Sequence, residues 1–168
     1  MKIKVSLVAW AAAAMLLQPD SLVANIQKTT HYFAHYTHPS PRPDLSPEDV
    51  IAIQLKAFQE NDHNDTGIET VFSFAAPENK KYTGPLDFFK AMVKNPTYDP
   101  LLNLKKYTPQ KLRVEGNTAQ QIIVITDRVG KKAAYLFTLS KQTEGPYKDC
   151  WMTSSVIRLA YEDKTVNT

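Results

Sequence analysis

The stretch TAQQIIVITDRVGKKAAYLFTLSK, residues 118–141, contains two apolar segments separated by a short polar turn. Within residues 119–126 the odd positions are Ala, Gln, Ile and Ile, and the even positions are Gln, Ile, Val and Thr. This alternation predicts a β-strand that is covered on one face and partly covered on the other. Gly130, inside the turn at residues 127–131, predicts that the second segment returns beside the first. The stretch therefore predicts two neighbouring strands of an antiparallel sheet.

Turn-forming residues divide the C-terminal half of the chain into four predicted strands. The turns lie at residues 115–117, 127–131 and 143–146, each with one glycine. We therefore expect a four-stranded antiparallel meander that ends near residue 160. On its last strand, Trp151 and Thr153 are two residues apart and so share a face.

Three helices are predicted before the sheet. In the first, Ser46 is expected to cap, Pro47 to occupy the first turn, and an apolar stripe to continue to Phe58. The second is expected to begin at Thr66, which has capping-box spacing with Glu69, and to end before Pro77.

The third helix is expected within GPLDFFKAMVKNP, residues 84–96, with Gly84 as its cap and Pro85 at its start. Three helices followed by a long meander predict an α+β domain, with the helices on one face of a curved sheet. Such a sheet can enclose a cavity.

The N-terminus has the pattern of a secretory signal peptide, because Lys2 and Lys4 precede an apolar run from Val5 to Leu17. The run is shorter than the ~20 residues that span a bilayer, so we expect no permanent membrane anchor. Four regions are predicted: a signal peptide over 1–24, a Pro/His-rich arm or linker over 25–45, the α+β domain over 46–160 and a polar tail over 161–168.

The arm contains His31, His35 and His38, whose spacing places three imidazoles on one face of a helix. Residues 39–47 contain four prolines, which impose an extended path typical of an arm or linker. A short arm near a free terminus seldom supplies the fixed geometry and second-shell partners that a zinc site needs. We therefore expect no metal and no cofactor. The 20 basic and 17 acidic residues are scattered, so we expect no nucleic-acid partner. A single cysteine, Cys150, excludes an intrachain disulfide, and stability must come from the core.

Five strings resemble the nuclear transport factor 2-like superfamily, and within it a family of small exported proteins of unknown function. The resemblance covers about residues 46–160. It departs from the family at Ser154 and Ser155, where the family has an acidic residue and a glycine. The strings are IQLKAFQEND (53–62), FSFAAPENKKYTGPLDFFKAMV (72–93), VEGNTAQQIIVIT (114–126), YLFTLSKQ (135–142) and DCWMTSSVIRL (149–159).

The resemblance implies a cone in which the three helices close the open side of the four-stranded sheet around a pocket. It implies either an exported, non-enzymatic binding or accessory module, or a proton-transfer enzyme of the isomerase, dehydratase or cyclase kind. The partner would be a small apolar ligand or a protein, with a homodimer through the sheet as a further possibility. The expected lining residues are Phe58, Phe72, Phe88, Tyr98, Tyr135, Trp151 and Thr153.

The enzymatic alternative requires a carboxylate or histidine inside the cone. The available candidates are Asp62, Asp87, Asp99 and His63, each of which lies in a turn or at a helix end in the predicted structure. No paired carboxylates, metal triad or nucleophile–base set is visible, so no catalytic residue is assigned and the binding function is favoured.

Removal of the leader is directly testable by N-terminal mass analysis of the protein secreted from its native host. We expect the mature chain to begin near Asn25, because Ala24 is a small residue that follows the apolar run. Retention of Met1 on most molecules would contradict the export prediction.

Overall fold

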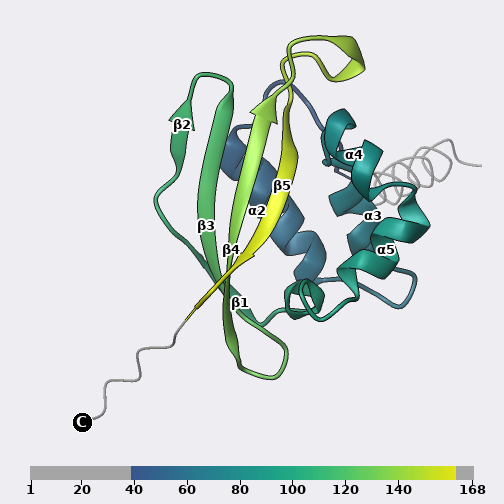
Figure 1. Cartoon of the computed structure of the whole chain (residues 1–168), viewed down its shortest axis with the longest axis vertical. Helices are drawn as coiled ribbons and strands as arrows, with labels where there is room; N and C mark the ends of the chain where they lie inside the picture. Colours follow the sequence, from purple (N-terminus) through teal and green to yellow (C-terminus); the bar gives the residue numbers. More distant parts are fainter. Residues whose placement is uncertain (1–38, 162–168) are drawn as a thin grey trace, which may run out of the picture. The chain divides into compact units, whose positions relative to one another are not determined.

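The computed structural model describes residues 39–161 (Figure 1). The predicted leader, the three arm histidines and residues 162–168 of the predicted tail lie outside the described residues. The elements are α2 (Pro47–Gln59), α3 (Thr66–Ser73), α4 (Pro77–Thr83), α5 (Leu86–Val93), the 3-10 helix η1 (Asp99–Leu101), β1 (Lys106–Pro109), β2 (Arg113–Glu115), β3 (Thr118–Thr126), β4 (Lys132–Lys141), the 3-10 helix η2 (Gly145–Tyr147) and β5 (Trp151–Leu159).

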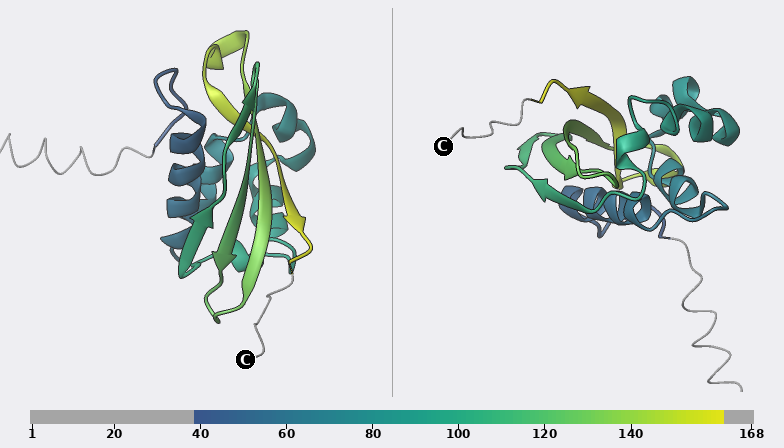
Figure 2. Two further views of the ribbon diagram at one scale, coloured as in Figure 1. Left: turned by 90° about the vertical axis from the view of Figure 1, so that its left-hand side faces the viewer. Right: turned by 90° about the horizontal axis from the view of Figure 1, so that it is seen from below.

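The sequence prediction of an α+β protein with an antiparallel sheet is confirmed. All strand pairs are antiparallel, in the order β1-β3-β4-β5, and β2 also pairs with β3. The turned views in Figure 2 show α2 against one face of the sheet, and Figure 1 shows α3, α4 and α5 beside β5. The helices therefore cover one face and continue past one edge of the sheet.

The described residues form five strands, whereas the sequence predicted four. The predicted first strand is divided into β1 and β2, which pair with consecutive parts of β3. Pro109 pairs with Ile123, and Arg113 pairs with Gln120. Four positions from β1 to β2 therefore correspond to only three positions along β3. The extra residue is a bulge, at the place where Pro109 cannot donate a ladder hydrogen bond.

The described residues also form four α-helices, whereas the sequence predicted three. The additional helix is α4, which begins at Pro77. The sequence interpretation used this proline as the end of the preceding helix. Proline is equally suited to a first helical turn, because the N–H that it lacks would have no intrahelical partner there. In the structure Pro77 separates two helices and begins the second.

Only one of the three predicted helix caps has the predicted geometry. Ser46 and Asp49 form the reciprocal capping box of α2, at 3.1 and 2.9 Å. The Thr66 cap prediction is wrong, because the N-cap of α3 is Asp65 and the helix-start amide of Thr66 donates to Asp62. The Gly84 prediction is also wrong: this residue ends α4, and Pro85 precedes α5.

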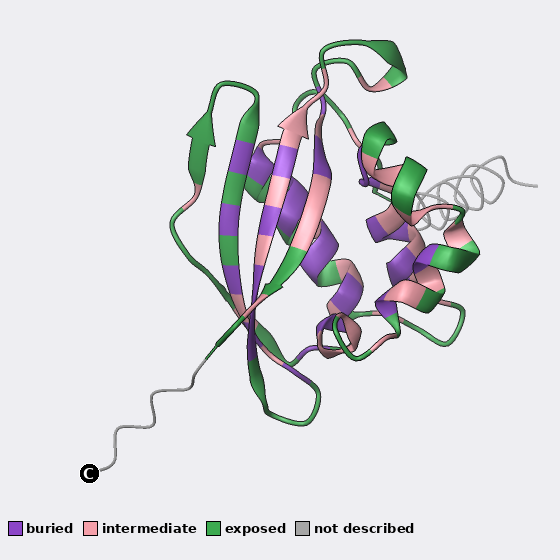
Figure 3. Cartoon of the chain, viewed as in Figure 1, coloured by how far each residue is buried: buried purple, intermediate pink, exposed green. Residues whose placement is uncertain are grey.

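One face of the sheet forms the core together with α2 and α3 (Figure 3). Tyr135, Phe137 and Leu139 alternate along β4 and are fully buried against the helices. The two helices approach closely at Gly67, where an added Cβ would lie 2.0 Å from the carbonyl oxygen of Ala57. A side chain at this position would force α3 away from α2, so glycine is required for the packing.

Thr153 of β5 connects the sheet to the helices. Its N–H donates to the carbonyl of Phe74 (2.8 Å), and its carbonyl accepts from the N–H of Ala76 (2.9 Å). These two bonds form a short parallel bridge between β5 and the chain at Ala75. Its hydroxyl lies 2.9 Å from Nε2 and 3.0 Å from Oε1 of Gln54 on α2. Both side chains are buried, and although Nε2 of Gln54 also donates to the Val50 carbonyl at 3.1 Å, the Thr153 hydroxyl is the side-chain partner of the Gln54 amide.

A second bulge, at Ser154, keeps the helix-facing side of β5 in register. Thr153 pairs with Leu139 and Ser155 with Thr138, so Ser154 is the extra residue. Val156 is consequently opposite Phe137, whose side chain is in the core. The prediction that Trp151 and Thr153 share the helix-facing side agrees with this register, and Trp151 packs half-buried against the core.

We predict that Thr153→Val lowers the free energy of unfolding by about 1–3 kcal/mol, because the buried Gln54 amide loses its side-chain partner. The double variant Thr153→Val with Gln54→Met should recover part of this loss, since both polar groups are then removed. Thr138→Val, the same substitution on the outer sheet face, is the control and should change stability by less than about 0.5 kcal/mol. Urea denaturation measures all three, and equal stability of the two single variants would contradict the buried pair.

Candidate functional site

A pocket of about 260 Å³ lies between the outer edge of β5 and the helices α4 and α5. Its walls are mainly aliphatic and aromatic. From α5 come Phe89, Met92 and Val93; from β5 come Ser155, Val156 and Ile157; from α4 come Asn79 and Thr83; and Phe58, Tyr98 and Leu101 complete the lining.

The pocket borders a strand edge because β5 is the last strand of the sheet. The parallel bridge to Ala75 is at Thr153 only. Further along, the phenol of Tyr98 donates to the carbonyl of Val156 at 3.1 Å. Residues 155–157 therefore contribute to the pocket wall next to a strand edge that is covered by helices rather than by another strand.

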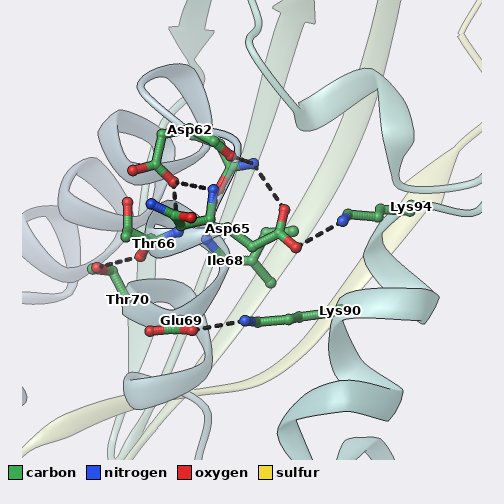
Figure 4. A network of polar contacts seen from close by, with 10 residues as sticks. Asp62, Asp65, Thr66, Ile68, Glu69, Thr70, Lys90 and Lys94 are labelled. Carbon is green, nitrogen blue, oxygen red and sulfur yellow. Dashed lines mark hydrogen bonds and ion pairs between the residues drawn. The ribbon is translucent and has the colours of Figure 1, made fainter.

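Two ion pairs hold α5, which forms the opposite wall, against α3 (Figure 4). Nζ of Lys90 lies 2.7 Å from Oε1 of Glu69, and Nζ of Lys94 lies 2.7 Å from Oδ2 of Asp65. The Lys94 hydrogen bond lowers the pKa of Asp65, whose side chain is largely buried, and keeps it ionised. Parallel pairs one turn apart fix the rotation of α5 and so direct its apolar side chains into the pocket.

Besides the phenol of Tyr98, the polar side chains of the pocket lie on α4 and β5. Asn79 and Thr83 are four residues apart on α4 and therefore share a helix face. Nδ2 of Asn79 donates to the Thr153 carbonyl at 3.1 Å, and the Thr83 hydroxyl donates to the Asn79 carbonyl at 3.0 Å. Ser155 contributes a hydroxyl from β5. Among the lining residues in the described part of the chain there is no carboxylate, amine or imidazole.

Two of the seven predicted lining residues, Phe58 and Tyr98, line this pocket. Phe72 lies behind it, with its ring centroid 5.1 Å from that of Phe89. Phe88 is instead at the surface, 55% exposed, because it lies on the side of α5 that faces away from the core.

The other three predicted residues belong to the packed interior. Tyr135 is fully buried, its phenol donates to the Thr97 carbonyl at 2.8 Å, and burial raises its pKa to about 12. Trp151 packs against the core and Thr153 bonds to Gln54. The concave face expected to form the pocket is thus occupied by side chains at these positions, and the pocket described above lies at the β5 edge.

The four candidate proton-transfer residues, all within the described residues, lie outside this pocket. Asp62 accepts hydrogen bonds from the N–H groups of Asn64 and Thr66, and its pKa is lowered mainly by the bond from Thr66. Asp99 pairs with Arg128 at 2.8 Å. Asp87 and His63 are exposed. Two of the acids thus have structural partners.

Sequence reasoning missed the polar residues of the pocket, Asn79, Thr83 and Ser155. Asn79 and Thr83 were missed because α4 was not predicted. Their spacing of four becomes informative once Pro77 is assigned to a first helical turn. Ser155 follows the bulge at Ser154, which alternation alone cannot locate.

The fold and pocket define an α+β protein with an antiparallel sheet and an uncharged pocket at its β5 edge. The chain belongs to the family described as Domain of unknown function (DUF4864), which matches residues 43–166. The chain has no match among curated proteins or solved structures.

The described residues also bear on metal binding and on membrane spanning. Residues 39–161 place no three His, Cys, Asp or Glu side chains where together they would hold a metal ion. The same residues include no helix with the length and apolar character needed to traverse a bilayer.

Proposed function

We propose that the protein is an exported, non-enzymatic binding or accessory module whose pocket takes a small, largely apolar ligand. The observation that carries the proposal is the pocket between α5 and the β5 edge, with its apolar walls and few polar groups. Ligand sites commonly combine a mostly apolar concave surface with a small number of polar groups that orient the ligand. Export is proposed from the charged start and short apolar run of residues 1–24.

We further propose that the domain is a nuclear transport factor 2-like cone. The order of elements, with helices first and an antiparallel sheet after them, supports this proposal, as do the strings that resemble the superfamily. A fold of this kind accommodates both enzymes and binding modules, so the activity has to be argued from the site.

The properties of the site favour binding over proton transfer. A general acid or base must reach the proton that it transfers, usually within about 3 Å or through one water. The described lining residues of the pocket contribute no carboxylate or imidazole, and the Tyr98 phenol is engaged in a hydrogen bond that it donates to the Val156 carbonyl. The proposal is therefore a binding function, and the isomerase, dehydratase or cyclase alternative has no supporting observation.

A second surface supports the proposal of a homodimer through the sheet. On the outer face Ile122 is opposite Leu136, and Leu136 is opposite Ile157, so three apolar side chains form a row across β3, β4 and β5. Ile122 and Ile157 are 38% and 52% exposed. An apolar row of this kind is typical of a protein–protein contact.

Ligand binding is tested with the neutral fluorescent probe 1-aminonaphthalene, whose two fused rings match the pocket in size, and the full mature chain. We expect the wild type to enhance the fluorescence of the probe saturably. Met92→Trp should bind the probe at least tenfold more weakly, because the indole ring fills part of the pocket. Phe88→Trp is the matched control, since it puts the same ring on the exposed side of α5. Equal binding by Met92→Trp, or none by the wild type, would contradict the pocket.

The dimer is tested by sedimentation velocity at micromolar concentrations. The wild type should show a dimeric species that Leu136→Lys abolishes, because the substitution places a charge at the centre of the apolar row. Val129→Lys, at an exposed apolar residue in the β3–β4 turn, is the control. A wild type that is monomeric throughout would refute the sheet-face dimer.

A further inference from the structure

We infer that the ligand of this pocket is an uncharged molecule with a hydrogen-bond-donating head group, such as an alcohol, on an apolar body. The inference rests on the proposed binding function and specifies the chemistry of the ligand. It is carried by two features of the pocket: the absence of charge in its described lining and the arrangement of open acceptors on α4 and β5.

The lining excludes a charged head group on energetic grounds. Burial of an ion costs several kcal/mol unless a charged or multiply hydrogen-bonding partner offsets the lost hydration. The side chains around the pocket are aliphatic, aromatic, amide and hydroxyl groups. Lys90 of α5 and Lys94 at its C-cap are paired with Glu69 and Asp65, so neither supplies a counter-charge. A carboxylate would enter without a counter-charge, and an ammonium would meet only neutral acceptors, which do not replace the hydration of a buried cation.

The polar atoms of the pocket that have unused hydrogen-bonding capacity are mainly acceptors, which favours a hydrogen-bond donor on the ligand. One N–H of Asn79 Nδ2 and the hydroxyl proton of Thr83 are used within the protein, which leaves the second N–H of Nδ2 open. Oδ1 of Asn79 and the lone pairs of Thr83 Oγ1 are acceptors on the same face of α4. The hydroxyl of Ser155, a lining residue on β5, can both donate and accept. An alcohol donates one hydrogen bond and accepts two, so it can donate to one acceptor on α4 and accept from the remaining N–H of Asn79 or from Ser155.

The volume sets the size of the apolar body. An apolar cavity of about 150 Å³ holds benzene, so the 260 Å³ of this pocket correspond to about ten non-hydrogen atoms. A medium-chain alcohol is of this size. Its chain would lie among Phe89, Met92 and Val93, which form the apolar wall of α5.

The test compares 1-octanol, octanoate and octylammonium as competitors of 1-aminonaphthalene on the full mature chain at pH 7.5. These molecules share an apolar chain and differ in the charge of the head group. We expect 1-octanol to displace the probe at a concentration at least tenfold lower than either ion. Octanoate or octylammonium competing as well as octanol would overturn the inference, as would bound probe that octanol does not displace. Absence of probe binding would instead overturn the proposed function itself.

Two variants distinguish recognition of the head group from non-specific apolar binding. Thr83→Val keeps the branched shape and removes the hydroxyl, so octanol affinity should fall roughly fivefold, which corresponds to one lost hydrogen bond. Thr83→Lys supplies a cation and should make octanoate a better competitor than it is for the wild type. Both variants should retain the wild-type thermal melting profile. Unchanged competition by all three molecules in both variants would show that α4 does not contact the head group.

Discussion

The structure depends on the bonds made by Thr153. Its backbone joins β5 to the chain at Phe74 and Ala76, and its hydroxyl bonds to Gln54 within α2. Because α4 begins at Pro77, directly after this bridge, the bridge fixes where α4 lies along the edge of the sheet. The edge strand is thus partly covered by its own chain, which limits pairing with other molecules.

The pocket follows from the same constraint. The bulge at Ser154 restores the helix-facing register after the bridge, so Val156 continues the row begun by Thr153, and Ser155, opposite Thr138, lines the pocket from the other face of the strand. On the opposite side, the pairs of Lys90 with Glu69 and of Lys94 with Asp65 hold α5 against α3. Ion pairs that are partly exposed contribute little stability, and here their value is orientation.

The sequence predicts the elements with regular patterns and fails where one residue permits two interpretations. The alternation in residues 118–141 was enough to predict two paired strands, and Ser46 with Asp49 was enough for the first helix. Pro77 is equally consistent with the end of one helix and the start of the next, so α4 and its pocket residues were missed. Aromatic residues such as Tyr135 cannot be assigned to core or pocket without knowing how helices fill the sheet's concave face.

The central claim is that ligands enter between α5 and the β5 edge. Backbone amide shifts of isotope-labelled protein, recorded during titration with 1-aminonaphthalene, test it most directly. The account predicts saturable shift changes at Thr83, Met92 and Val156, which surround the pocket. Changes confined to Lys56 and Gly67, in the separate groove between α2 and α3, would contradict it.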